Sequence, residues 1–486
     1  MITTFINKLF KIDENYHLTS WLFLKGLALI YFIAFASLSV QIVGLVGSDG
    51  ILPVQEFLHK VSQHYGGPQW WKVPTLFWFN DSDFFLQVVC YLGCFFSVLL
   101  FFGLQSRLSL IILFLSYLSL FHAGQTFLSF QWDTLLLESG FLAIFLYKRP
   151  TVLIIFLFHL LLFRLRFLSG LSKLLSGDPA WSGLTTLNYY FETQPLPHIG
   201  SWYMQQLPEW FMVIATALVL VMELIVPLFI FLPRKFKIFA AVSTIILQLI
   251  IIATSNHNFV NLLTILLCLF LLDDKFIQSL IPKFKQDKIK QSISPSGVFS
   301  RIITSIMSIL LLSIILTQAY WYVFDKTLHS PFNEIARTGH HWGIGNVFHI
   351  FPTMQTERFE MMIEGSYDGK TWYPYQFKFK PNAVDQAPRF NVPHQPRLDW
   401  MIWFVPPQFS GMMPWFDAFM NRLKNNSPDV TKLLAYNPFA DKEAPKFLRV
   451  PVYRYQFTNF EERKKTGNWW KAEFLGYFPN VPLRRP

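Results

Sequence analysis

Three cations fall within one long apolar run of this sequence, where a charged side chain is costly. Arg164, Arg166 and Lys173 all occur in the stretch FRLRFLSGLSK, residues 163–173. A charge near the centre of a membrane helix costs at least ~2.5–3.5 kcal/mol on insertion scales. Such a residue is retained only where it meets a partner, water or a substrate. These cations are therefore the first candidates for chemistry.

His159, Arg166 and Lys173 recur at intervals of seven residues, so they lie along one stripe of a helix. Gly170 falls on the same face, where a small residue lets a second helix approach closely. We expect the stripe to face the interior of a helix bundle. In the alternative, Arg166 and Lys173 extend to the headgroups near the outer end of the helix. A lysine desolvated inside a bundle could act as a base.

Two carboxylates are available as counter-charges. Glu223 lies within an apolar run four residues before Pro227, which leaves the carbonyl of Glu223 without its helical donor. Glu223 is either a counter-charge or a protonated group that hydrogen-bonds between helices. Glu138 could pair with Arg164, Arg166 or Lys173.

Further polar residues sit at the ends of apolar runs. Gln131, Trp132 and Asp133 open one run, and Asp133 could cap its helix by accepting backbone N–H bonds. Asn256 and Asn258 lie in a polar elbow between two other runs. This elbow is either a solvated loop or the rim of a cavity.

A last polar group lies far along the chain, in HQPRLDW, residues 394–400. His394, Arg397, Asp399 and Trp400 follow one another closely before an apolar strand. Arg397 and Asp399 are two residues apart and would share one face of that strand. We expect them to form a structural ion pair.

Common catalytic signatures are absent from the sequence. It has no Walker loop, HExxH, GxSxG or paired CxxC motif, and its GIG at 343–345 is too short for a dinucleotide site. Without clustered Cys and His residues, we predict no metal site. The sequence names no cofactor, so the cofactor stays unknown.

The composition is typical of a membrane protein that also has a more polar, water-exposed region. Of the 486 residues, 52% are hydrophobic and only 15% charged, against roughly 25% charged in soluble proteins. The net charge of +11 comes largely from short connections between apolar runs. Such basic connections set membrane orientation, so we predict no nucleic-acid partner.

The apolar runs predict a polytopic α-helical membrane protein with about nine transmembrane helices. The fourth and eighth runs are short, so either could be a tilted or re-entrant half-span. If nine spans alternate, all the most basic connections fall on one side, which is then cytoplasmic. We predict a transmembrane helical domain over 1–323 and a C-terminal β-rich domain over 324–486 on the other side. The expected spans are 19–44, 84–103, 108–128, 134–147, 151–175, 210–232, 237–254, 259–273 and 302–323.

The C-terminal region alternates in polarity like a β protein. Residues 358–364 and 372–379, separated by a glycine-rich turn, predict a hairpin, and 452–457 with 469–474 predict a second strand pair. Apolar residues at helical spacing predict a helix over 414–423, and Ser427-Pro428 resembles another helix start.

Several long segments resemble the lipase maturation factor family. Together with the region around GILP (50–53), they span most of the chain. They are QWDTLLLESGFLAIF (131–145), FRLRFLSGLSK (163–173), LNYYFETQPLP (187–197), RFEMMIEGSYDG (358–369) and HQPRLDW (394–400).

The resemblance implies a membrane protein that helps secreted lipases fold and assemble into active dimers. The partners would then be client secreted proteins, with lipases among them, and membrane lipid. In a eukaryote the compartment would be the endoplasmic reticulum. The plain tail and residue usage favour a bacterial chain, which implies the inner membrane and a periplasmic tail.

The membrane region also resembles vitamin K-dependent gamma-carboxylases, through GLSKL at 170–174. In those enzymes a lysine of this stretch serves as a base, which makes Lys173 a candidate catalytic base here. Two hypotheses follow. The first is a chaperone-like maturation factor, not an enzyme, that meets clients through exposed Trp372, Trp469 and Trp470. The second is an intramembrane enzyme acting on a lipid, a quinone or a client side chain.

Overall fold

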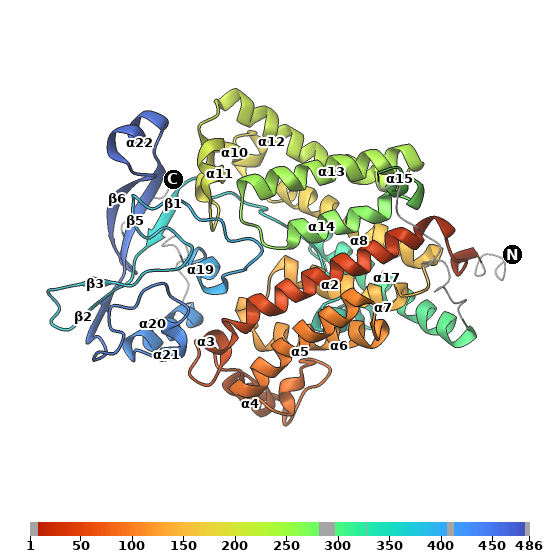
Figure 1. The fold of residues 1–486 in the computed structure, drawn as a ribbon, viewed down its shortest axis with the longest axis horizontal. Coiled ribbons are helices and arrows are strands. Elements are labelled where there is room, and N and C mark those ends of the chain that lie inside the picture. The colour runs from red at the N-terminus through yellow and green to blue at the C-terminus, as the bar shows by residue number, and fades with distance from the viewer. Residues whose placement is uncertain (1–7, 281–296, 327, 406–412, 482–486) are drawn as a thin grey trace.

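Long helices form a bundle, and a smaller region with β-strands lies at one end of it (Figure 1). The computed structural model describes residues 8–280, 297–326, 328–405 and 413–481. Seven helical segments are long and apolar enough to cross a membrane. They are α2 (His17–Ser39) with the preceding turn η1 (Glu14–Tyr16), α5 (Asp83–Phe102), α6 (Ser106–Ala123), α8 (Val152–Leu175), α12 (Glu209–Leu224) with η4 (Val226–Phe231), α13 (Arg234–Thr254) and α17 (Val298–Phe324).

The other two expected spans are shorter helices within the same bundle. The fourth is α7 (Gln131–Leu146), and the eighth is α14 (Val260–Cys268) extended by η5 (Leu269–Leu271). The sequence marked these two runs as short, and their helices are indeed the short ones. Seven of the nine expected spans are thus confirmed as membrane-length helices.

Helix α8, which carries the three cations, is the central helix of the bundle. Of its most apolar window, 72% is buried, against 22% for α13 and α17. A charged residue on α8 therefore meets protein on most sides.

Short helices connect the long ones at both ends of the bundle. At the end away from the strands, α15 (Asp274–Leu280) follows η5, and its Asp274 accepts N–H bonds from the first residues of α2. This contact fixes the start of α2 as a helix cap does. The remaining short elements are α3 (Ile42–Val46), α4 (Val54–Tyr65), η2 (Leu76–Trp78), η3 (Gln125–Phe127), α9 (Pro179–Ser182), α10 (Thr186–Thr193) and α11 (Ile199–Gln205).

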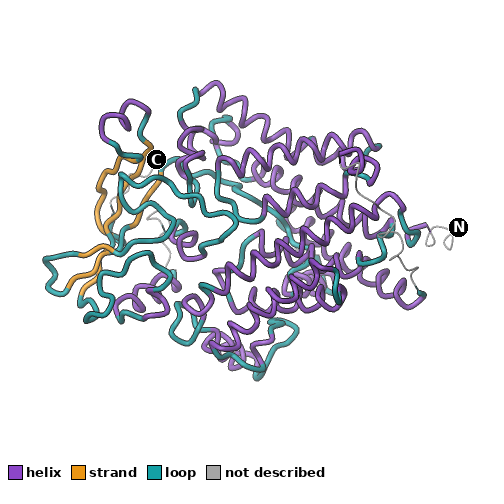
Figure 2. Tube along the Cα trace, in the orientation of Figure 1, coloured by secondary structure: helices purple, strands orange, loops and turns teal. Residues whose placement is uncertain are grey.

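The C-terminal region, called the tail below, begins after α17 and contains two small antiparallel sheets. Figure 2 shows all its strands gathered at one end of the molecule. Their spatial orders are β1-β5-β6 and β3-β2-β4. The strands are β1 (Arg358–Met361), β2 (Glu364–Ser366), β3 (Tyr373–Pro374), β4 (Phe447–Arg449), β5 (Pro451–Phe457) and β6 (Trp470–Tyr477).

The first predicted hairpin is only partly right. β2 pairs with β3 across the glycine-rich turn, but β1 pairs with β5, with Arg358 opposite Tyr455. The chain bends after β1, so the two halves of one predicted strand enter different sheets. The second predicted pair is confirmed, because β5 pairs with β6 from Phe457–Trp470 to Pro451–Tyr477.

The predicted tail helices are confirmed as α20 (Pro414–Lys424) and the short α21 (Pro428–Thr431), which starts after Ser427 as expected. The tail also contains α18 (Phe332–His341), α19 (Arg397–Ile402) and α22 (Phe460–Thr466). One apolar core runs without a break from bundle residues such as Phe35 to tail residues such as Phe419. The tail is therefore packed onto the bundle and not tethered to it by a linker alone.

Candidate functional site

Glu138 and Arg164 form a buried ion pair between α7 and α8. The tail covers this pair with its backbone. Gly345 N donates to Glu138 Oε2 at 3.0 Å, and Arg164 donates to the Asn346 carbonyl at 2.9 Å. Gly345 adopts φ +72°, and a Cβ there would lie 2.3 Å from Ile314. Only glycine fits this turn, which explains the GIG motif without any dinucleotide.

Lys173 and Arg166 share one carboxylate, Glu223 of α12. Lys173 Nζ donates to Glu223 Oε2 at 2.7 Å, whereas Arg166 lies 3.5 Å from Oε1, a looser electrostatic contact. All three side chains are buried. The helices approach closely because Gly170 has no side chain: a Cβ there would lie 2.9 Å from the Glu223 Cβ. The interior orientation predicted for the stripe is confirmed.

The amine of Lys173 has no hydrogen left for a substrate. It lies 3.1 Å from both the carbonyl and the hydroxyl oxygen of Ser169, and 2.8 Å from the carbonyl of Ile350 in the tail. With the Glu223 carboxylate, four acceptors surround the three N–H donors of the ammonium group. His159, two turns before Arg166 on the same stripe, is also engaged, with Nε2 2.6 Å from the Phe270 carbonyl.

Asp133 and Arg397 form a third buried pair, between α7 and tail helix α19. Arg397 is bidentate on Asp133, at 2.6 and 2.7 Å, and also donates to the Phe127 carbonyl at 3.0 Å. The Tyr117 hydroxyl donates to the same carboxylate at 2.5 Å. The prediction that Asp133 caps its helix is wrong, because Phe130 holds the cap position and Asp133 lies inside the first turn.

The predicted Arg397–Asp399 ion pair is also wrong. The segment is helix α19 and not a strand, so the two side chains point in different directions. Asp399 accepts the backbone N–H bonds of Phe379 and Lys380, at 2.7 and 3.0 Å. Burial raises the pKa of the Asp399 carboxyl, and these N–H bonds oppose the rise.

Gln131, Trp132, His394 and Trp400 lie on the segments that carry Asp133 and Arg397, and the Trp132 ring lies 5.9 Å from the Arg397 guanidinium. Gln131 accepts the His349 N–H at 3.0 Å, and the rings of Trp132 and Trp400 meet edge to face at 5.1 Å. His394 Nδ1 lies 3.0 Å from the hydroxyl of Ser37 in α2. The side chains of Arg397 and Asp133 are 2% and 0% exposed, so the pair is shielded from water.

The polar elbow between α13 and α14 is buried, so it is not a solvated loop. Asn256 donates to the carbonyls of Leu196 and Arg389, at 3.0 and 2.8 Å, and accepts the Asn391 N–H at 3.2 Å. Asn258 stays within the elbow and accepts the N–H of the next residue at 2.5 Å. The elbow is another contact between bundle and tail.

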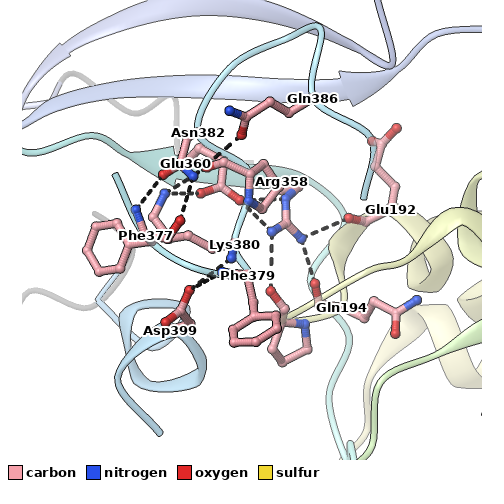
Figure 3. Close-up of polar contacts among 12 residues, drawn as sticks. Glu192, Gln194, Arg358, Glu360, Phe377, Phe379, Lys380, Asn382, Gln386 and Asp399 are labelled. Carbon is pink, nitrogen blue, oxygen red and sulfur yellow. Dashed lines mark hydrogen bonds and ion pairs between the residues drawn. The ribbon is translucent and has the colours of Figure 1, made fainter. Parts of the chain in front are cut away.

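A network that the sequence did not predict lies deeper in the tail (Figure 3). Glu360 pairs with Arg358 and, at 2.9 Å, with Lys380. Arg358 also donates to the carbonyl of Glu192 in the last turn of α10 and to that of Gln194 in the loop that follows. Period-two spacing of Arg358 and Glu360 was visible in the sequence, but their burial was not.

These contacts all link bundle-side residues to the tail, and we call them together the junction: the ion pairs of Glu138, Glu223, Asp133 and Glu360, together with Asn256. Each of the four pairs either joins the bundle to the tail directly or has a member that hydrogen-bonds to backbone of the other region. Among the described residues, no group of three or more His, Cys, Asp or Glu side chains is placed to hold a metal. The junction is arranged to hold the tail on the bundle.

The junction should be sensitive to acid through His257, which lies in the elbow outside the apolar helices. Burial lowers the pKa of His257 to about 4. Between pH 4 and 6.5 the unfolded chain binds more protons there, so stability falls as pH falls through this window. We expect about 2 kcal/mol of loss from this residue between pH 7 and pH 5.

His257→Gln tests this expectation, because glutamine can still bond Tyr190, the partner of His257, but cannot titrate. The thermal midpoint of the purified protein should drop less between pH 7 and pH 5 in this variant than in the wild type. Equal drops in both proteins would show that His257 does not carry the effect.

Two family models match the chain. The lipase maturation factor transmembrane domain covers residues 18–279, and the lipase maturation factor C-terminal domain covers 344–479. The chain belongs to the lipase maturation factor family. Lipase maturation factor 2 of Gallus gallus is 32% identical over 96% of this chain and 81% of its own length, and that of Xenopus tropicalis is 31% identical over 96% and 82%.

Lipase maturation factor 1 of Bos taurus is 30% identical over 97% of this chain and 90% of its own length. No solved structure matches. The segments that resemble the lipase maturation factor family are those that build the junction: 131–145 contains Asp133 and Glu138, and 394–400 contains Arg397. Much of the family signature in this chain therefore serves to join the two regions.

Proposed function

We propose that this membrane protein assists the folding and maturation of secreted proteins, with lipases as clients. The observation that carries the proposal is the junction, which fixes a soluble region at one end of a membrane bundle. A folding factor that acts beside a membrane needs such a fixed surface, and part of it must be apolar. The names of its relatives support lipases as the client class.

The client surface cannot include two of the three aromatic residues expected from the sequence. Trp469 and Trp470 are 9% and 1% exposed and pack with Trp202 and Phe457 inside a second small core. The prediction that Trp469 and Trp470 are exposed is wrong, because both rings are packed into this core. Trp372 is half-buried and lies under the guanidinium of Arg449.

Another aromatic surface is exposed nearby, and we propose it as the client site. This surface, the aromatic face, consists of Trp372, Phe447, Arg449, Phe474 and Tyr477. Phe474 and Tyr477 are 50% and 44% exposed with ring centroids 5.3 Å apart, and Arg449 lies 5.3 Å from Tyr477. Aromatic and arginine side chains dominate protein interfaces. β6 is also an edge strand of its sheet, which leaves backbone groups for an extended client segment.

Phe474→Ser with Tyr477→Ser should weaken client maturation by about tenfold, since central aromatic residues contribute most of an interface's affinity. The measurement is the activity per mole of secreted lipase from cells that depend on this chain. Tyr436→Ser is the control, because Tyr436 is 52% exposed in the tail but outside the aromatic face. If the double variant gave the same lipase activity as the Tyr436→Ser control, the aromatic face would not be the client site. If cells without this protein secreted lipase of the same activity, the proposed function would be wrong.

We also propose the arrangement in the membrane that the sequence predicts: nine spans, a division near 323/324, and the tail in the lumen of the endoplasmic reticulum or in the periplasm. Loops expected on the tail's side do contact it. Asp178 accepts the Met354 N–H at 2.8 Å, and Ser427 donates to the Asp49 carbonyl at 2.9 Å. Labelling a cysteine introduced at Lys446 in sealed vesicles checks the orientation; labelling from the cytoplasmic side contradicts it.

The carboxylase-like alternative is not favoured. A general base needs a free lone pair within reach of its substrate, and the Lys173 amine is surrounded by acceptors. Both family models and the relatives carry the maturation factor name instead.

A further inference from the structure

A small hollow opens between α11 of the bundle side and α22 of the tail. It has a volume of about 220 Å³ and is lined by Trp202, Phe460, Arg463, Lys464 and Gly467. Two cations and two aromatic rings thus share one opening. The junction and the aromatic face use none of these residues.

Arg463 is held in place by rings and not by acids. Its guanidinium lies 3.5 Å from the Trp469 ring centroid and 5.1 Å from that of Trp202. Stacking engages the flat face of a guanidinium and leaves its N–H edge for other acceptors. Among the described side chains, no carboxylate lies within ion-pair distance of Arg463 or Lys464. The nearby Glu462 is instead bound to Lys471 at 3.0 Å.

The hollow lies near the start of α12, which together with η4 is long and apolar enough to cross a membrane. Phe460 of α22 contacts Trp202 and Tyr203 of α11, with centroids 5.0 and 6.3 Å apart. Two residues separate the end of α11 from Pro208, which precedes membrane helix α12, and Figure 1 shows α22 next to this corner. Tyr203 and Trp210 are 51% and 65% exposed here. Exposed Tyr and Trp at the end of a membrane helix are typical of the headgroup level.

We propose that this hollow binds the phosphate of an anionic phospholipid from the leaflet on the tail's side. Arg463 and Lys464 hold the phosphate, and the apolar part of the lipid lies along Tyr203 and Trp210. Continuity with the membrane-facing surface favours a lipid over a soluble anion or an acidic peptide. Two basic residues at this level attract anionic lipid by an amount that corresponds to about 30-fold in affinity.

The test measures binding of the purified full-length protein, in neutral detergent, to phosphatidylglycerol, phosphatidylcholine, inorganic phosphate and a hexaglutamate peptide. Phosphatidylglycerol should bind best. Arg463→Ala with Lys464→Ala should weaken that binding about 30-fold, and Lys464→Ala alone about fivefold. Lys370→Ala with Lys446→Ala removes the same charge from exposed turns at the far end of the tail, and should have little effect.

Trp210→Ala separates a lipid from a free anion, because it should weaken phosphatidylglycerol binding and leave phosphate binding unchanged. Lys464→Ala keeps the test valid if removal of stacked Arg463 disturbs the fold, since no described side chain bonds Lys464. Equal weakening by the Lys370 and Lys446 pair would overturn the proposal. So would phosphate or hexaglutamate binding as tightly as the lipid, or unchanged lipid binding in both Lys464 variants.

Discussion

Glu223→Gln should destabilise this protein more than any other single change in the bundle, by about 3–5 kcal/mol. Glu223 is the carboxylate that two buried cations share, Lys173 at 2.7 Å and Arg166 at 3.5 Å. With it, the cluster has a net charge of +1; without it, two positive charges face each other away from water. Membrane abundance and the thermal midpoint should both fall sharply.

Lys173→Met provides the contrast, because it removes a cation and leaves Arg166 paired with Glu223. The cluster becomes neutral. The remaining loss of stability comes from buried acceptors left without a donor, such as the Ile350 carbonyl, and should be about 1–3 kcal/mol. A structural role thus predicts that Glu223→Gln is worse than Lys173→Met. Glu209→Gln is the matched control, since Glu209 opens the same helix but is exposed.

A catalytic role for Lys173 predicts a different order of effects. Lys173→Met would then abolish client activation while abundance and thermal midpoint stayed at wild-type values. If Glu223→Gln proved as stable as the wild type, Glu223 would not be stabilising the two buried cations. Either result would contradict the junction as described.

The sequence predicted the buried cations but not their partners. Spacing by seven placed Arg166 and Lys173 on one interior stripe, because helical period is a local property. Glu138 had three candidate partners, and only the approach of α7 to α8 selects Arg164. Helix–helix distances depend on contacts such as Gly170 against Glu223, which are not visible in either segment alone.

The tail was harder to predict, because its structure depends even more on contacts between segments that are distant in the sequence. Short strands such as β2 and β3 have little local signal, and β1 finds its partner β5 almost a hundred residues away. The segment 397–402 reads equally well as an apolar strand, but contact with α7 and the tail favours a helix. Once it is helical, Arg397 and Asp399 can no longer share a face.

Arg397→Met tests whether the tail is held by the junction, and we expect a loss of about 3–5 kcal/mol. The substitution leaves Asp133 buried without the bidentate cation that neutralises its charge, although the Tyr117 hydroxyl still donates to it. The tail should also loosen, since this pair joins residues 264 positions apart. Faster proteolysis of the tail in membranes is the measurement, with the thermal midpoint beside it.

Two companion variants decide what the loss means. Asp133→Asn combined with Arg397→Met leaves no buried charge, so it should recover part of the stability, as coupled pairs do in double-mutant cycles. Arg422→Met breaks a second tail-to-loop pair, with Asp49, but Asp49 is 70% exposed, so the cost should stay below about 1 kcal/mol. The Arg422 and Arg397 pairs differ mainly in their access to water. If Arg422→Met loosened the tail as much as Arg397→Met, burial would not explain why the junction holds the tail on the bundle.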